Sequence, residues 1–353
     1  MRDRALYEIF AAVAIAIAAG LLAIRFLHGV GTRRDLRRHP APGKFENIEG
    51  SLLHYHVVGE GTPTVVFESG LMSTVLSWKE VQPEIAKRTS TFSYDRAGMG
   101  WSEAGAQPRD AGRMVRELHT LLDRAGARPP YILVGHSFGG LMTRLFAARY
   151  PDEVESVVLI DPVPPSEWHP VGETNRKRIR IGSRILRRAS TLARWGVLRF
   201  VAVILQSGLK PLAEPLVRLM SKGAPKGDGT TKSPLFWNLP ASERDMARVF
   251  WVQAKFTETI ASQLENLPQS ASQVVSEASN LGDIGLTVIS AADSSSARLA
   301  EHTAIAGTAA AGRHRKAERG GHWVMVDQPQ LVLDAIGEAI ESARRAHSVA
   351  AKA

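Results

Sequence analysis

The organisation of the chain is clearest around one segment, which reads Tyr131-Ile132-Leu133-Val134-Gly135-His136-Ser137-Phe138-Gly139-Gly140. Its first four residues are apolar, as in a buried strand, and residues 141–149 have apolar side chains at helical spacing. A strand, a sharp turn and a helix form the context in which a G-x-S-x-G sequence presents its serine as a nucleophile. We therefore predict that Ser137 lies at the tip of a nucleophile elbow.

The residues around Ser137 suit that role. A side chain at Gly135 or Gly139 would clash with the neighbouring strand and helix. Because the helix begins just after Ser137, its free N–H groups and the positive end of its dipole point toward the serine. This arrangement favours an anion that forms at an attacked carbonyl.

Composition excludes several kinds of chemistry. The chain has 353 residues, enough for one large α/β domain with an insertion or for two small domains. It has no cysteine, which rules out thiol catalysis, disulfides and Cys-based zinc sites. The net charge is +9, but the excess lies on predicted helix faces without a recognised binding module. We expect no nucleic-acid partner, no cofactor and no metal.

The first residues differ from the rest. Ile9–Ile24 carries no charge, and no small-residue cleavage site precedes the basic stretch that follows. We interpret residues 1–28 as an uncleaved membrane anchor, with a signal peptide as the alternative, and residues 29–44 as a basic linker. By the positive-inside rule the body lies on the cytoplasmic side, since more cations follow the anchor (Arg33, Arg34, Arg37, Arg38 and Lys44) than precede it (Arg2 and Arg4).

Short apolar strands alternate with amphipathic helices through residues 45–162 and 281–347. This alternation predicts an α/β fold with a mostly parallel central sheet and helices on both faces. Residues 51–58 alternate between apolar and polar and are expected to form half of an antiparallel hairpin. The other predicted strands are residues 64–68, 90–94, 131–134, 156–160, 286–290 and 314–318.

Residues 163–280 form a long, mainly helical insertion, which we interpret as a lid. Asn175–Phe200 carries many arginines among apolar residues at helical spacing. Such a charge run forms a solvated face in many proteins. The alternative is an amphipathic helix that lies on an anionic membrane surface.

A serine nucleophile needs a histidine base and an acid that orients it. His322 follows a Gly-Gly turn after the last predicted strand, and the order serine, acid, histidine is typical of this kind of fold. Two aspartates follow strand ends, Asp161 and Asp293. We prefer Asp293, because Asp161 and the proline after it are explained by the turn into the lid.

Three motifs together resemble the α/β-hydrolase superfamily, in particular its esterase, peroxidase-like and proline-aminopeptidase-like branch. They are residues 135–140, residues 94–102 (Tyr-Asp-Arg-Ala-Gly-Met-Gly-Trp-Ser) and residues 320–323 (Gly-Gly-His-Trp). The resemblance spans roughly residues 49–345. It implies a triad and two backbone oxyanion donors, namely Ser137, Asp293, His322, Leu71 and Phe138.

The chain also departs from that family. Many members have His-Gly where this chain has Ser69-Gly70, and the frequent Gly-x-x-Asp pattern is missing before Asp293. A serine at the elbow argues against the epoxide-hydrolase and dehalogenase branches, which have an aspartate there.

The sequence thus predicts a serine hydrolase that cleaves a carboxylic ester through an acyl-enzyme on Ser137, with a lipophilic ester as one candidate. Aminopeptidase or amidase action and acyl transfer are the enzymatic alternatives. A catalytically silent membrane-surface binding module is the alternative of a different class. Covalent labelling of Ser137 by a fluorophosphonate separates an active triad from such a module.

Overall fold

A twisted sheet forms the centre of the computed structural model, which describes residues 2–206, 246 and 248–350. The sheet has eight strands in the order β1-β2-β4-β3-β5-β6-β7-β8. The pairs β1–β2 and β2–β4 are antiparallel and all others are parallel, which confirms the predicted hairpin and the mostly parallel sheet. The strands are β1 (Lys44–Ile48), β2 (Ser51–Val58), β3 (Thr64–Glu68), β4 (Thr91–Tyr94), β5 (Tyr131–His136), β6 (Val154–Ile160), β7 (Gly285–Ser290) and β8 (Arg313–Lys316).

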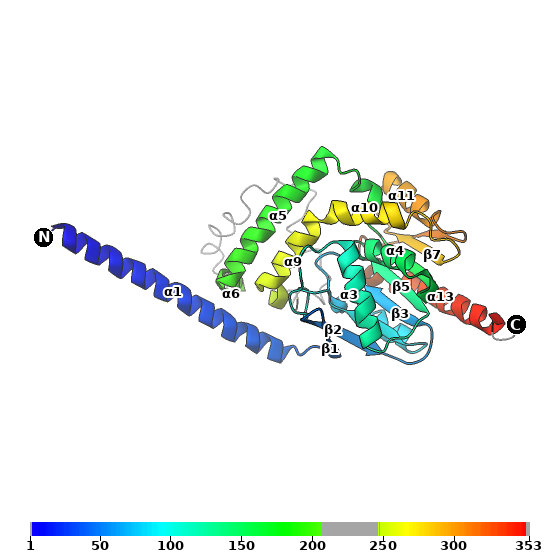
Figure 1. The fold of residues 1–353 in the computed structure, drawn as a ribbon, viewed down its shortest axis with the longest axis horizontal. Coiled ribbons are helices and arrows are strands. Elements are labelled where there is room, and N and C mark those ends of the chain that lie inside the picture. The colour runs from blue at the N-terminus through cyan, green and yellow to red at the C-terminus, as the bar shows by residue number, and fades with distance from the viewer. Residues whose placement is uncertain (1, 207–245, 247, 351–353) are drawn as a thin grey trace.

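Helices cover both faces of the sheet, as the apolar strands require (Figure 1). In β5 the side chain of Leu133 packs on one face, and those of Ile132 and Val134 pack on the other. The first face is covered by α3 (Ala111–Arg124), α4 (Gly139–Arg149), α10 (Leu267–Glu277) and α11 (Ser296–Ala306). The second is covered by η1 (Val75–Trp78), α2 (Gln82–Ala86), α12 (Val324–Asp327) and α13 (Pro329–Ala350).

The N-terminal helix α1 (Arg2–Arg38) projects away from this body (Figure 1). Its segment Tyr7–Arg38 has a mean hydropathy of 2.4 in its most apolar window, none of which is buried. By length and composition it is a candidate membrane span, although a signal sequence has the same features. The helix continues through Arg38, so the predicted linker, residues 29–44, is helical as far as Arg38.

An insertion of helices joins β6 to β7. Residues 207–245 and 247 of the predicted lid lie outside the described part. The predicted helix over residues 175–200 is divided in two at Gly196, whose φ of 78° a helix does not accommodate. The described elements are η3 (Pro165–Glu167), α5 (Glu173–Arg194), α6 (Val197–Gln206), α9 (Ala254–Glu265) and α10.

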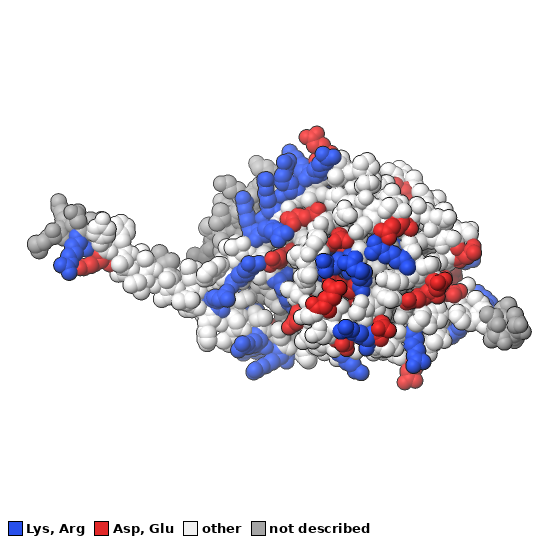
Figure 2. All heavy atoms as spheres, in the orientation of Figure 1, with Lys and Arg blue, Asp and Glu red and all other residues white. Residues whose placement is uncertain are grey.

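The arginines of α5 have two kinds of surroundings. Arg187 and Arg194 form ion pairs with Glu265 and Glu258 of α9, each at 2.5 Å, and so join the two helices. Lys and Arg side chains also gather along the outer side of α5 in Figure 2. The charge run therefore combines pairing to the body with an exposed basic face.

The insertion lies over one part of the sheet edge. A cluster of buried apolar residues, among them Met99, Phe250 and Phe256, packs against the partly buried Leu71 and Met72. These two residues belong to the loop that follows β3. The insertion therefore packs on the loop from which the sequence predicts an oxyanion donor.

Candidate active site

The turn between β5 and α4 has the predicted elbow geometry. Ser137 has a φ of 52°, a left-handed conformation that is strained for a residue with a side chain. A Cβ on Gly135 would lie 2.6 Å from Thr143 Oγ1, and one on Gly139 would lie 2.5 Å from Glu68 O. The predicted need for glycine at both positions is confirmed, because no larger residue fits between the elbow, α4 and β3.

The loop after β3 faces the elbow. A Cβ on Gly70 would lie 3.4 Å from the Cβ of Ser137. Within the described part of the chain, the N–H groups of Leu71 and Phe138 have no protein hydrogen-bond acceptor, as an oxyanion hole requires. Ser69, where the family pattern often has histidine, accepts a hydrogen bond from the indole N–H of Trp78 at 3.0 Å. Its side chain serves the loop and leaves the backbone donors free.

His136, inside the G-x-S-x-G motif, connects the elbow to the loop that carries His322 through a hydrogen bond. Its Nε2–H donates to the backbone oxygen of His322 at 2.9 Å, and the two rings lie 4.6 Å apart. Burial, reinforced by the nearby His322, lowers the pKa of His136 to about 3. His136 is therefore neutral near pH 7 and acts as a fixed donor. Sequence reasoning gave it no role, because any residue can occupy that position of the motif.

Asp161 contacts the ring of His322. Nδ1–H of His322 donates to Oδ2 of Asp161 at 2.6 Å, while Oδ1 accepts from Ala291 N–H at 3.1 Å and from the Ser294 hydroxyl at 3.3 Å. Burial alone would raise the pKa of Asp161. Two effects outweigh burial and lower this pKa to about 2: the hydrogen bond and charge of His322, and the hydrogen bond from the Ala291 N–H. Asp161 is therefore a carboxylate near neutral pH, and its bond leaves Nε2 of His322 with a free lone pair.

His322 and Ser137 lie at the same edge of the sheet, but no hydrogen bond joins their side chains in the described structure. Among the described residues, Ser137 Oγ has no hydrogen-bond partner, and the two loops meet through His136. Backbone strain gathers at this edge. Of four described non-glycine residues with positive φ, three are here, namely Met72 at 64°, Ser137 at 52° and Asp161 at 40°. Such strain is typical of residues that are held in place for function.

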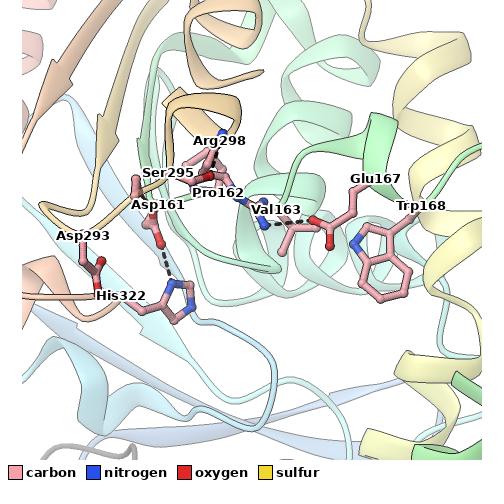
Figure 3. A pocket seen from close by; sticks show the side chains of 10 residues that line it. Asp161, Pro162, Val163, Glu167, Trp168, Asp293, Ser295, Arg298 and His322 are labelled. Carbon is pink, nitrogen blue, oxygen red and sulfur yellow. Dashed lines mark hydrogen bonds and ion pairs between the residues drawn. The ribbon is translucent and has the colours of Figure 1, made fainter. Parts of the chain in front are cut away.

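A pocket of about 380 Å³ opens beside His322 (Figure 3). Pro162, Val163 and Trp168 supply its apolar wall, and an ion pair between Arg298 and Glu167 at 2.9 Å supplies a polar one. The remaining lining residues are Asp161, Asp293, Ser294, Ser295 and His322. No group of three or more His, Asp or Glu side chains suited to a metal ion is found in the described ranges.

Comparison with known proteins agrees with this fold. A family model described as the alpha/beta hydrolase fold matches residues 63–329, which is most of the chain. The chain belongs to the α/β-hydrolase family. One curated relative is the uncharacterized protein YqjL of Bacillus subtilis, which is 37% identical over 120 residues, 34% of this chain and 47% of that protein. Another is the human (lyso)-N-acylphosphatidylethanolamine lipase, 32% identical over 124 residues, 34% of each chain.

A solved structure supports the fold of this α/β hydrolase. The enol-lactonase from Burkholderia xenovorans LB400 superposes with a TM-score of 0.56 at 20% identity, over 84% of this chain and 99% of that one. At this identity the likeness concerns the fold alone. The matched segment spans about half or less of the first curated relatives, so their activities do not transfer to this chain directly.

In this α/β hydrolase the geometry corrects our choice of acid. Asp293 is exposed, and in the described structure no hydrogen bond joins its carboxylate to His322. Figure 3 shows Asp293 beside His322, but the imidazole ring of His322 is hydrogen-bonded to Asp161. The loop after β7 instead supports the other acid, through Ala291 and Ser294. The prediction that Asp293 orients the base is wrong in this structure, and Asp161, the alternative, has that position.

Proposed function

We propose that the protein is a serine hydrolase that cleaves a carboxylic ester through an acyl-enzyme on Ser137. The observation that carries the proposal is the bond of His322 Nδ1 to a partly buried, ionised Asp161 beside a strained serine elbow. This bond fixes the tautomer in which Nε2 can accept a proton. A serine hydroxyl is a poor nucleophile without such a base.

In the first step, Ser137 Oγ attacks the carbonyl carbon of the ester and His322 Nε2 takes the hydroxyl proton. The imidazolium that forms is stabilised by the Asp161 carboxylate. Negative charge develops on the former carbonyl oxygen, which accepts hydrogen bonds from the N–H groups of Leu71 and Phe138. Each such donor contributes on the order of 100-fold or more in rate, because the pair is oriented before the charge appears.

In the second half, His322 returns the proton to the leaving alcohol and the tetrahedral intermediate collapses to an acyl-Ser137. Water then enters, gives its proton to His322 and attacks the acyl carbonyl. Ser137 Oγ leaves and recovers the proton. The cycle needs only the chain's own groups and a water molecule.

The pocket beside His322 would hold one half of the ester. Its apolar wall suits a short alkyl or acyl group, while the Arg298–Glu167 pair in its lining suits a polar substituent. A volume of about 380 Å³ limits what can enter without movement of the inserted helices.

The proposal is tested by labelling and by turnover. The wild-type chain and Ser137→Ala are treated with a fluorophosphonate and then assayed on p-nitrophenyl esters of increasing acyl length. We expect labelling and hydrolysis that both disappear with Ser137→Ala. A wild-type chain that neither labels nor turns over any ester would refute the proposal and favour a binding module.

We also propose that α1 anchors the protein in a membrane with its body on the cytoplasmic side, and that the basic face of α5 meets anionic lipid. The apolar span Tyr7–Arg38 and the cations at its C-terminal end support this orientation. Deletion of residues 1–38 should move the protein from the membrane fraction to the soluble fraction. Protease added to intact cells reports the side of the membrane. The body should be protected if it lies in the cytoplasm, and its digestion would contradict the proposal.

A further inference from the structure

A buried cation lies directly beneath the oxyanion loop. Arg96 follows β4 and is only 3% exposed. Its partner is Glu68, the last residue of β3, which is 1% exposed and also accepts a hydrogen bond from the Tyr94 hydroxyl. The proposed reaction does not use this ion pair. Burial of two charges costs free energy unless their mutual attraction and further hydrogen bonds offset the loss of solvation.

Arg96 also contacts the loop itself. Nη1 donates to the backbone oxygen of Ser69 at 2.6 Å, and Nη2 donates to that of Gly70 at 2.6 Å. The guanidinium carbon lies 5.6 Å from the ring centre of Phe138. One side chain therefore touches the residues that carry, or immediately precede, both proposed oxyanion donors.

The contact with Gly70 has a geometric consequence. The Gly70 carbonyl and the Leu71 N–H belong to the same peptide group, which is trans, since the described cis bonds all precede proline. In a trans peptide the C=O and the N–H point in opposite directions. Because Arg96 and the Ser73 N–H (3.3 Å) both hold the Gly70 oxygen, the Leu71 N–H must point to the other side of the loop.

We propose that Arg96 is a positioning residue for the oxyanion hole: it holds the Gly70–Leu71 peptide so that the Leu71 N–H faces the substrate carbonyl. This inference rests on the proposed function, because the N–H has that role only if Ser137 attacks a carbonyl. Glu68 and Tyr94 then have a clear purpose. They neutralise and orient the guanidinium so that its remaining donors reach the two carbonyls.

A purely structural role is the competing explanation, and the chain offers a matched control. Arg109 is fully buried and forms a bidentate ion pair with Glu117 at 2.5 and 2.6 Å. Its other side-chain hydrogen bond goes to Ala106 O, not to the oxyanion loop. Loss of Arg109 should therefore affect stability like loss of Arg96, without any effect on the direction of the Leu71 N–H.

The experiment uses the full chain in detergent micelles and compares Arg96→Gln, Arg96→Lys and Arg109→Gln. It measures kcat and KM on a p-nitrophenyl ester, the inhibition constant of a trifluoromethyl ketone that forms a tetrahedral anion on Ser137, and the thermal midpoint. For Arg96→Gln we expect kcat to fall about 10- to 100-fold, somewhat less than for complete removal of an oxyanion donor. KM should change less than about threefold, and the inhibition constant of the ketone should rise by about the same factor by which kcat falls.

Arg96→Lys keeps a charge in the buried site and should retain part of the wild-type kcat. If Arg96→Gln does not fold, Arg96→Lys provides the test in its place. Arg109→Gln should lower the thermal midpoint but leave kcat within about twofold below the transition. Equal kcat losses in the Arg96 and Arg109 variants, or wild-type ketone affinity in a folded Arg96→Gln, would overturn the inference. If the wild-type chain does not react with a fluorophosphonate, the proposed function itself fails, and that outcome is visible before any variant is made.

Discussion

Replacement of Asp161 by Asn is the sharpest test of the site geometry. The fall of the Asp161 pKa from 3.8 to about 2 corresponds to about 2 to 3 kcal/mol of preference for the carboxylate over the neutral acid. An amide at this position loses that charge interaction, which amounts to about 60-fold if it acts wholly in the transition state. The introduced amide can also present its N–H₂ group to Nδ1 of His322, which would place the proton on Nε2 and remove the base. A wrong tautomer costs up to about 10⁴-fold in related triads.

We therefore expect kcat of Asp161→Asn to fall by a factor between about 10² and 10⁴, while Asp293→Asn stays within about threefold of wild type. Both variants are assayed on the same p-nitrophenyl ester, with circular dichroism to show that each is folded. Asp293→Asn is the matched control, because it removes a carboxylate from the same pocket without breaking a hydrogen bond to His322. The reverse order of losses would refute the assignment of Asp161 and restore Asp293 as the acid.

Two further predictions concern stability. Because the folded pKa of Asp161 lies below its unfolded value, its contribution is fully present above about pH 4 and is lost as the pH falls toward 2, by up to about 2 kcal/mol. Urea unfolding across that range should show a steeper loss for wild type than for Asp161→Asn, and equal slopes would contradict the shift. Gly135→Ala should destabilise the fold by about 1–3 kcal/mol through its clash with Thr143. Gly307→Ala is the control and should change the urea midpoint little, because its Cβ would meet its neighbours only at ordinary contact distances.

Much of the fold could be predicted from local pattern. Strand β3 was predicted at its observed bounds, and β4 and β7 within one residue, because buried parallel strands are short apolar runs between turn residues. The elbow could be predicted because its two glycines, its serine and its strand and helix are adjacent in the chain. The N-terminal helix was predicted too short, since a run of cations does not end a helix that begins in an apolar segment.

The choice of acid could not be predicted because it depends on distances between loops far apart in sequence. Strands β6 and β7 are neighbours in the sheet, so the residues after both reach the same edge, and both offer an aspartate. Which of the two aspartates reaches His322 depends on the path of the backbone in each loop. Asp161 sits in a left-handed conformation at the strand end, where its side chain points to His322 and the β7 loop donates two hydrogen bonds to it. Asp293 lies two residues beyond Ala291, the first of those donors, on a loop whose backbone already serves the other acid. The two aspartates are therefore not interchangeable: Asp293→Asn leaves this support intact, while Asp161→Asn removes the group that the support holds.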